Sequence, residues 1–551
     1  MEQTLEWTPP GPGPWQQDSA HNPIAQTLLM QQIYPDGFNR GFTDAFAAFG
    51  LLLDRLAMGV VNGFTYHQPQ PFDMPGPDGP KDPAWIGAEF GRRNEVAAGA
   101  FANKIWRDVI KTWDDELKPA SIARHRELAI DLSGLDHAQL RAHVDACIEH
   151  LHAMVYQHHR FNTHALAPVG DFMLHAAGWT HRPPGSLMGV LDGYSPVSNV
   201  APPEMQAALA ALRSSGDARD LLFGGGDPAS VIAGLRAHVP AVDEYIANVH
   251  YRVLNGFDVS NPTIGERPET LVGRLQSALQ VDPKSGHTRS DEFAAELRNA
   301  TPEEHRAEFD ELLTEARFVY RLRDERGLYS DVSAIGVLRL ALLEFGRRLV
   351  ADGRLDAAAD ILEAGVDEVR AIFDGASAPT GHDLQLRGVD RVERTLAGAP
   401  RFLGPPPPDP PPLDMLPPPL ARVMAAVGFL IEGVLGELEA PDGDASVIGG
   451  IAGAGGVYEG TARLVHSVDD LFEIEQGDVL VVAATGEAFN SMLHLVGAIV
   501  TDHGSFASHA AIMSREMGFP SVVGTVDGTR RIRTGMRVRV DGDAGRVTIL
   551  E

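Results

Sequence analysis

The segment Thr501–Gly524 reads TDHGSFASHAAIMSREMGFPSVVG and decides the fold of the C-terminal region. The apolar run Ala498–Thr501 predicts a strand that ends where this segment begins. A loop of small residues follows, and the pattern after Ser508 predicts a short helix that Gly518 ends. Ser508 is the expected N-cap, because its hydroxyl can accept a hydrogen bond from an unpaired amide of the first turn. His509 then stands at the start of the helix.

A histidine at a helix N-terminus is suited to carry a phosphoryl group. The unpaired amides of the first turn and the positive end of the helix dipole favour an anion at this place. A neutral imidazole is a nucleophile, and a protonated one is a good leaving group. The alternative is a core histidine beside a helix cap, which a lone His509 would not exclude.

The segment resembles the swivelling phosphohistidine domain of the PEP-utilising enzymes, which include PEP synthase, pyruvate phosphate dikinase and rifampicin phosphotransferase. The family pattern is roughly T-[DE]-x-G-G-x-x-[ST]-H-[AG]-A-[IV]-x-[AS]-R-E-x-G-x-P-x-V-V-G. The residues that match it are Thr501, Asp502, Gly504, Ser508, His509, Ala511, Arg515, Glu516, Gly518, Pro520 and Gly524. Ser505 replaces the second glycine of the pattern, and His503 is unusual for the family. The resemblance implies that His509 is the catalytic phosphoryl carrier. The residues then expected to stabilise the phosphoryl group are Gly504, Ser505, Ser508 and Arg515.

The composition indicates a large acidic protein without nucleic-acid or membrane partners. The 551 residues are enough for about two to four domains. Forty-six basic and 75 acidic residues give a formal net charge of −29, whereas nucleic acids and anionic membranes bind basic surfaces. The single cysteine, Cys147, excludes an internal disulfide and a cysteine-based zinc site. No apolar run is long enough to cross a membrane and no signal-type segment is present, so we expect a cytoplasmic protein.

The sequence predicts three regions. Residues 1–400 carry mostly helical periodicity and form the expected helical substrate-binding domain. Residues 401–447 are a linker with a connecting helix, and ten of the fifteen residues from Pro405 to Pro419 are proline. Six strand patterns within residues 448–551 predict a compact α/β domain, which the resemblance identifies as the phosphohistidine domain. The expected fold class is therefore multidomain: a large, mostly α-helical substrate domain and a C-terminal α/β swivelling domain on a semi-rigid tether.

Near the N-terminus, Trp15, Asp18 and His21 form a W-x-x-D-x-x-H run. It resembles the opening of the substrate domain in proteins of the rifampicin phosphotransferase type, so Asp18 and His21 are candidates for binding the substrate or deprotonating it. A tryptophan anchor with polar neighbours is the structural alternative. Farther along, the apolar pattern of residues 42–63 predicts a helix, and the prolines of residues 65–82 predict a loop.

The helical pattern of residues 136–164 contains seven histidines. They are His137, His143, His150, His152, His158, His159 and His164. Because His158 and His159 are adjacent, we expect their side chains to diverge. The pattern also lacks H-E-x-x-H and a dense set of carboxylates, so we expect no metal site. These histidines are predicted to be solvated or to line the core, and His164 is a further candidate for a substrate-pocket base.

Three arginines lie within two turns of the charged helix predicted for residues 302–326. Arg317 and Arg321 are four residues apart and share a face, and Arg323 follows. The family carries basic residues on a comparable helix that meets the phosphorylated histidine, and guanidinium groups bind phosphoryl oxygens bidentately. The alternative is salt bridging on a solvated face. The available acidic partners are Glu311, Glu315, Asp324 and Glu325.

The sequence lacks a G-x-x-x-x-G-K-[ST] loop and the alternating pattern of an ATP-grasp domain, and it ends just after the phosphohistidine region. We therefore expect ATP and Mg²⁺ to bind to a separate ATP-grasp subunit, with neither held tightly by this chain. This arrangement resembles the two-component aryl-phosphate-forming enzymes, phenylphosphate synthase and the hydroxyphenylethanone (hydroxyacetophenone) dikinases. The resemblance implies that ATP is converted to AMP and phosphate as His509 is phosphorylated. A phenolic hydroxyl then takes the phosphoryl group.

Three alternatives remain open at this point. The chain could be a component of a rifampicin-type antibiotic phosphotransferase, with the same chemistry on another hydroxyl. It could be a non-catalytic phosphocarrier or regulatory subunit that docks partners through its helical region. It could also be a scaffold in which Ser505 has disabled the phosphate loop.

Overall fold

The computed structural model describes most of the chain. The described residues are 5–18, 24–76, 79–199, 201–254, 256–280, 285–394, 396–407, 412–435, 446–466, 469–486, 489–490, 492–506 and 508–550. They form two compact units. The first unit comprises Met1–Ala167, Tyr251–Pro262 and Glu325–Ala425, and the second comprises Pro168–His250, Thr263–Asp324 and Ala426–Glu551. Each unit combines segments from distant parts of the sequence. The domain boundaries that the sequence predicts near residues 400 and 448 follow chain order instead, and they stay a prediction.

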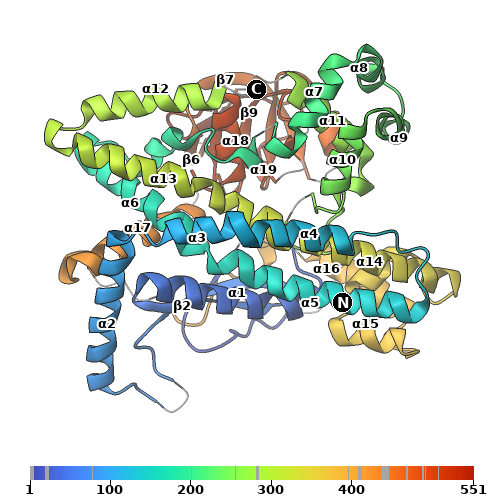
Figure 1. The fold of residues 1–551 in the computed structure, drawn as a ribbon, viewed down its shortest axis with the longest axis horizontal. Coiled ribbons are helices and arrows are strands. Elements are labelled where there is room, and N and C mark those ends of the chain that lie inside the picture. Colours follow the sequence, from blue (N-terminus) through green and yellow to red (C-terminus); the bar gives the residue numbers. More distant parts are fainter. Residues whose placement is uncertain are drawn as a thin grey trace. The chain divides into compact units, whose positions relative to one another are not determined.

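The first unit is built around two long helices that lie side by side, α1 (Leu28–Phe49) and α5 (His137–Arg160) (Figure 1). Glycines allow their backbones to approach closely. A Cβ atom added at Gly37 would lie 2.9 Å from the Cβ of Val155, and one added at Gly41 would lie 2.7 Å from the Cβ of His159. This contact fixes the C-terminal end of α5, which carries His158 and His159.

Other helices surround this pair in the first unit. They are α2 (Pro83–Ala102), α3 (Trp106–Thr112), α4 (Lys118–Leu128), α14 (Ser333–Ala351), α15 (Val366–Phe373) and α16 (Gly381–Glu393). Helix α5 starts with a complete capping box, in which the Asp136 side chain accepts from the amide of Gln139 and the Gln139 side chain accepts from the amide of Asp136. The helical character predicted for residues 136–164 is confirmed.

The first unit also contains an antiparallel sheet of order β2-β3-β1-β4, which corrects two predictions. Its strands are β1 (Trp15–Gln17), β2 (Leu53–Val61), β3 (Phe64–Pro71) and β4 (Phe402–Leu403). The helix predicted for residues 42–63 was wrong beyond Phe49, and the loop predicted for residues 65–82 was wrong for β3. Asn62 and Gly63 have φ values of 52° and 86° and join strands in which Val61 pairs with Phe64. Asn-Gly is a strong signal for such a two-residue hairpin turn.

The second unit has a helical part made of several segments. Its helices are α6 (Asn162–Thr180), α7 (Gln206–Ser214), α8 (Gly216–Phe223), α9 (Pro228–His238), α10 (Pro240–Val249), α11 (Pro268–Gln280), α12 (Ser285–Ala300), α13 (Arg306–Gly327) and α17 (Pro418–Leu435). Three of these helices, α6, α13 and α17, also include residues of the first unit. The charged helix predicted for residues 302–326 is therefore present as α13.

An eight-stranded sheet of order β5-β12-β11-β7-β8-β9-β10-β6 forms the rest of the second unit. Its strands are β5 (Val447–Gly449), β6 (Ile451–Ala454), β7 (Val457–Val465), β8 (Asp478–Val482), β9 (Val496–Thr501), β10 (Ser521–Val523), β11 (Arg537–Asp541) and β12 (Arg546–Ile549). Strands β7 to β10 run parallel, and the outer strands are antiparallel. All six predicted strands are confirmed.

Short helices α18 (His509–Met517) and α19 (Gly528–Arg531) accompany this sheet (Figure 1). The sheet has its own core of small and β-branched residues, among them Val479, Val500, Val522 and Val540. The molecule is mostly α-helical with a C-terminal α/β region, as the sequence predicted.

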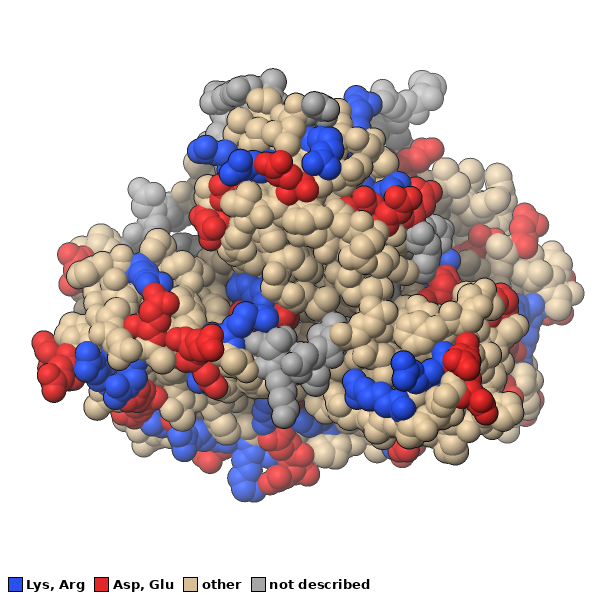
Figure 2. All heavy atoms as spheres, turned by 90° about the horizontal axis from the view of Figure 1, so that it is seen from above, with Lys and Arg blue, Asp and Glu red and all other residues tan. Residues whose placement is uncertain are grey.

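The surface seen in Figure 2 carries both signs of charge. Basic and acidic side chains are interspersed there with wide uncharged areas, so this face does not present a continuous basic patch. Among the described residues, no helix combines the length and the apolarity that a membrane span requires.

Candidate functional site

The loop between β9 and α18 places His509 at the first position of a helix. Ser508 has the extended backbone of an N-cap, with φ −74° and ψ 163°, but its side chain makes no capping hydrogen bond. The expectation that the Ser508 hydroxyl caps the helix was therefore wrong, and its buried Oγ has no hydrogen-bond partner among the described residues. Gly504 has φ +110°, and a Cβ there would lie 2.8 Å from the Cβ of Ser508. Only glycine fits this turn without strain.

His509 is held by one hydrogen bond and leaves its other nitrogen unpaired. Its Nδ1 lies 2.8 Å from the Oγ1 of Thr485, and its Nε2 is buried without a partner among the described residues. When Nδ1–H donates to Thr485, the lone pair is on Nε2, the atom that can act as nucleophile. Burial lowers the pKa of His509 to about 4, so the ring is neutral at physiological pH.

Sequence reasoning missed Thr485. It follows the carboxyl end of β8, and β8 pairs in parallel with β9, whose carboxyl end leads to His509. Residues that follow neighbouring parallel strands lie at the same edge of a sheet, where sites commonly form. This topological signal was available once both strands had been predicted.

Asp502 fixes the start of the same loop. Its carboxylate accepts hydrogen bonds from the amide of Thr529, at 2.9 Å, and from the hydroxyls of Thr525 and Thr529. Its own amide donates to the carbonyl of Val482 at the end of β8. The match of Asp502 to the family pattern therefore has a structural explanation. Ser505 is buried, and its carbonyl accepts from the amide of Ser508 at 2.9 Å.

Two charges on α13 act on His509. Asp324 raises the pKa of His509 and Arg323 lowers it, both less strongly than burial does. The carboxylate of Asp324 accepts hydrogen bonds from the hydroxyls of Ser195 and Ser198. Of the three arginines predicted to offset phosphoryl charge, Arg323 is the one whose charge reaches His509 in this way.

The other two arginines of the prediction have different surroundings. Arg317 donates to the carbonyl of Val190 at 3.0 Å, pairs with Asp291 at 2.9 Å and lies over the ring of Tyr194. These contacts correspond to the structural alternative, although with an acidic partner that the sequence did not suggest. Arg321 is half-buried. A phosphate-stabilising role for Arg317 and Arg321 stays a prediction.

The far end of α18 is fastened to the helical part of the second unit. The Arg515 guanidinium donates to the carbonyls of Gly453 and Phe506, at 2.8 and 2.9 Å, and to the carboxylate of Asp192 at 3.2 Å. Glu516 accepts from the amide of Gly193, and burial raises the pKa of Glu516 to about 7. These contacts give Arg515 a structural role, and its role in holding phosphate stays a prediction.

The predicted base candidates belong to the N-terminal half. Asp18 is buried, and its carboxylate lies 2.9 Å from the Nε2 of His67. His164 is buried against the edge of Phe49, and burial lowers the pKa of His164 to about 4. His21 lies outside the described residues. Asp18 and His164 are both in the first unit, whereas His509 is in the second.

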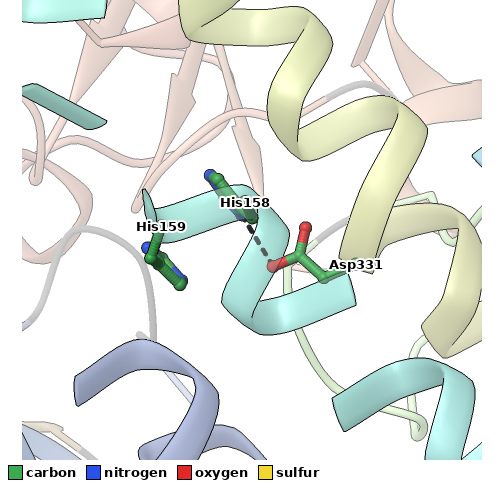
Figure 3. Close-up of side chains that lie close together, drawn as sticks. All are labelled: His158, His159 and Asp331. Atoms are coloured by element: carbon green, nitrogen blue, oxygen red, sulfur yellow. Dashed lines mark hydrogen bonds and ion pairs between the residues drawn. The ribbon is translucent and has the colours of Figure 1, made fainter. Parts of the chain in front are cut away.

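The first unit also brings together a cluster that sequence reasoning missed, His158, His159 and Asp331 (Figure 3). The imidazole rings of His158 and His159 stack with centroids 4.3 Å apart, so the expectation that these adjacent side chains diverge was wrong. Asp331 comes from the π-helical turn η7 (Leu328–Val332). One potential ligand atom from each residue lies within 4.8 Å of the others, and all three residues are buried. Because Asp331 lies far from the histidines in sequence, spacing could not reveal the cluster.

Comparison with known proteins identifies the C-terminal region. Residues 474–545 match the family model described as PEP-utilising enzyme, mobile domain. The chain carries the mobile domain of the PEP-utilising enzymes. This confirms the expected family resemblance and assigns Thr485, Asp502 and His509 to that domain.

Three curated relatives show how far the likeness extends. Chondramide synthase cmdD of Chondromyces crocatus is 31% identical over 58% of this chain and 8% of its own length. Rifampicin phosphotransferase of Streptomyces sviceus is 26% identical over 56% of this chain and 34% of its own length. Phosphoenolpyruvate synthase of Pyrococcus furiosus is 38% identical over 18% of this chain and 12% of its own length. The chain thus spans about a third or less of each of these relatives.

Proposed function

We propose that this chain is the phosphohistidine-carrying component of a phosphotransferase. The observation that carries the proposal is the state of His509 within a PEP-utilising mobile domain: a neutral imidazole at a helix start, with Nδ1 held by Thr485 and Nε2 without a partner in the described part of the chain. A nucleophilic nitrogen that is pre-oriented and not protonated is what phosphoryl uptake requires. The likeness to rifampicin phosphotransferase supports transfer to a hydroxyl acceptor.

In the proposed first half-reaction, a separate ATP-grasp subunit binds ATP and Mg²⁺, and the phosphoryl group passes from this ATP to His509. The Nε2 lone pair attacks a phosphorus atom of ATP and forms the nitrogen–phosphorus bond as one phosphoanhydride bond breaks. One water molecule hydrolyses the other phosphoanhydride bond, so that the rest of ATP leaves as AMP and phosphate. Gly504, Ser505, Ser508 and the first-turn amides of α18 would hold the phosphoryl oxygens. Arg323, whose charge already reaches the ring, would offset the added negative charge.

In the second half-reaction, a phenolic hydroxyl attacks the phosphorus and an aryl phosphate forms. The nitrogen–phosphorus bond breaks, and its electron pair stays on the His509 ring. The proton of the phenolic hydroxyl passes to a base, and this base finally gives the proton to the His509 ring. A phenol is acidic enough that this base contributes modestly. A rifampicin-type component is the second candidate, since the rifampicin phosphotransferase relative matches more than half of the chain.

The test is intact-protein mass spectrometry after incubation with ATP, Mg²⁺ and the ATP-grasp protein encoded nearest to this chain. We expect the wild type to gain one phosphoryl group and His509→Ala to gain none. His503→Ala, which removes the other histidine of the same loop, is the matched control and should still be phosphorylated. Absence of phosphorylation with a partner proven active on another carrier would refute the proposal.

A chase of the phosphorylated chain separates the candidate acceptors. Loss of the phosphoryl group to phenols, with an aryl phosphate as product, supports the aryl acceptor. Loss to rifampicin but not to phenols supports the antibiotic-modifying alternative. A phosphorylated chain that transfers to neither would favour the phosphocarrier alternative.

A further inference from the structure

We propose that the buried network of Tyr34, His159, Asp331 and His158 in the first unit binds an aromatic hydroxyl compound, whose hydroxyl donates to the Nδ1 nitrogen of His159. The proposed function enters only in identifying this compound as the phosphoryl acceptor. Binding itself needs neither His509 nor a partner subunit.

Asp331 organises the network, and three of the about four acceptor positions of its carboxylate are already occupied. Its Oδ2 accepts from the hydroxyl of Tyr34 at 2.7 Å and lies 2.7 Å from the Nδ1 of His158. Its Oδ1 accepts from the amide of Val332 at 3.0 Å. The carboxylate therefore positions Tyr34 and His158, and Figure 3 shows its contact with His158.

The hydrogen-bond pattern assigns the tautomer of His159. Since the Tyr34 hydroxyl donates to Asp331, its oxygen is left to accept from the Nε2–H of His159, at 3.3 Å. The Nδ1 of His159 then carries a lone pair. This atom is buried and has no hydrogen-bond partner among the described residues. Buried acceptors without a donor are rare in folded proteins, and one that is pre-oriented by its neighbours is suited to receive a ligand hydroxyl.

Aromatic rings pack against the rings of His159 and Tyr34. The ring centroids of Phe38 and Phe42 lie 4.4 and 5.5 Å from that of His159, and Phe257 lies 6.1 Å from the Tyr34 ring. Phe38 also stacks on His67, which has a second buried, unpaired Nδ1 and whose Nε2 is held by Asp18. Aromatic neighbours and a few oriented acceptors are the chemical environment that suits an aromatic ring carrying a hydroxyl group.

A metal ion is the competing occupant of the same residues, because His158, His159 and Asp331 could each supply a ligand atom. Two observations favour the hydroxyl compound. Asp331 already accepts two hydrogen bonds at Oδ2, the oxygen that contacts His158. The buried guanidinium of Arg326 donates to the carbonyl of His158, at 2.9 Å, and acts electrostatically on Asp331, so a dication would meet like charge.

The experiment measures binding to the purified full-length chain by isothermal titration calorimetry, without ATP or a partner. The probes are matched pairs that differ in the hydroxyl hydrogen: phenol and anisole, 4-hydroxyacetophenone and 4-methoxyacetophenone, 2-naphthol and 2-methoxynaphthalene. We expect at least one hydroxyl probe to bind about tenfold more tightly than its methyl ether, since the ether leaves the His159 acceptor unpaired. We expect His159→Phe to remove this difference while retaining the affinity for the ether.

The matched control is His125→Phe. His125 is a buried imidazole of the same unit that packs edge-on against His150 and lies outside the network, so this variant should keep the preference for the hydroxyl probe. Tyr34→Phe, which loses the oxygen that orients His159, should weaken the preference in an otherwise folded chain. The proposal is overturned if no hydroxyl probe binds, if probe and ether bind equally, or if His125→Phe matches His159→Phe. Saturable Zn²⁺ binding that Asp331→Asn abolishes, without probe binding, would assign the cluster to a metal instead.

The two proposals fail separately. A chain that binds the hydroxyl probe but never gains a phosphoryl group retains this site and contradicts the carrier function. A chain that is phosphorylated on His509 but shows no hydroxyl preference retains the carrier function and contradicts this site.

Discussion

At the scale of single residues, the environment of His509 determines its chemistry. A histidine in water has a pKa of about 6.5 and is partly charged near neutral pH. Burial lowers the pKa of His509 to about 4, so the nucleophilic form is present without a general base. The contact with Thr485 selects which nitrogen carries the proton. Neither property can be inferred from the identity of the residue alone.

The first prediction concerns Thr485→Val, which keeps the shape of the side chain and removes the hydroxyl. We expect phosphorylation of His509 to slow by about tenfold to a hundredfold, because the ring loses the hydrogen bond that orients it. The measurement is the rate of phosphoryl gain by mass spectrometry. Thr548→Val, on strand β12, is the control and should react at the wild-type rate. Equal rates for both variants would show that Thr485 does not position the ring.

The second prediction concerns stability against pH. The pKa of His509 is about 4 in the folded chain and about 6.5 in an unfolded one, so the unfolded chain binds more protons between these pH values. The free energy of unfolding therefore rises with pH across this window and is lowest at its acidic end. We expect His509→Asn to show a shallower rise than the wild type, measured by urea denaturation from pH 4 to pH 7. Parallel profiles would mean that His509 is not desolvated.

At the scale of secondary-structure elements, close backbone contacts decide which side chains meet. Helices α1 and α5 approach at Gly37 and Gly41, and this places His159 against the aromatic face of α1. The parallel pairing of β8 with β9 likewise brings Thr485 to His509. In both cases, residues far apart in sequence become neighbours because the elements that carry them pack in register.

The third prediction tests the helix contact with two glycine-to-alanine variants. Gly41→Ala puts a methyl group 2.7 Å from the Cβ of His159, so we expect a loss of about 1–3 kcal/mol in the free energy of unfolding. Gly87→Ala, inside α2, has nothing within 4 Å of the added Cβ and should be neutral or stabilise the chain by up to about 1 kcal/mol. Urea denaturation measures the free energy of unfolding of both variants. Similar changes in the two variants would show that α1 does not contact α5 closely.

At the scale of the whole molecule, the chain divides into two units that do not follow sequence order. All eight strands of the C-terminal sheet nevertheless lie within residues 446–550, and the residues of its core cluster come from the same range. It therefore has the attributes of an independently folding domain, although helical segments from residues 168–324 belong to the same compact unit.

The fourth prediction is that a fragment of residues 446–551 folds on its own. It retains all eight strands, Thr485 and His509. We expect a cooperative thermal unfolding transition and phosphorylation of His509 by the same partner that modifies the full chain. A fragment that is unfolded by circular dichroism would show that the helical segments of the second unit are needed for folding, and would contradict the domain boundary near residue 448.

The sequence by itself determined the C-terminal fold and the place of His509 at the start of a helix. The strand patterns after residue 456, the small-residue loop and the helix start at His509 are local features, and short-range periodicity and turn chemistry suffice to predict them. The hairpin at Asn62 and Gly63 has an equally local signal, but the apolar run before it also fits a helical period, and for this reason the predicted helix is wrong there.

Only the tertiary structure decided which distant residues surround each site. Thr485 contacts His509, the charges of Asp324 and Arg323 act on it, and Asp331 joins His158, although sequence spacing relates neither Thr485 to His509 nor Asp331 to His158. Burial, which sets the pKa values of His509 and Asp331, also arises only when separate segments exclude water together. The physical reason is that periodicity reports the local backbone, whereas proximity and desolvation are properties of the packed chain.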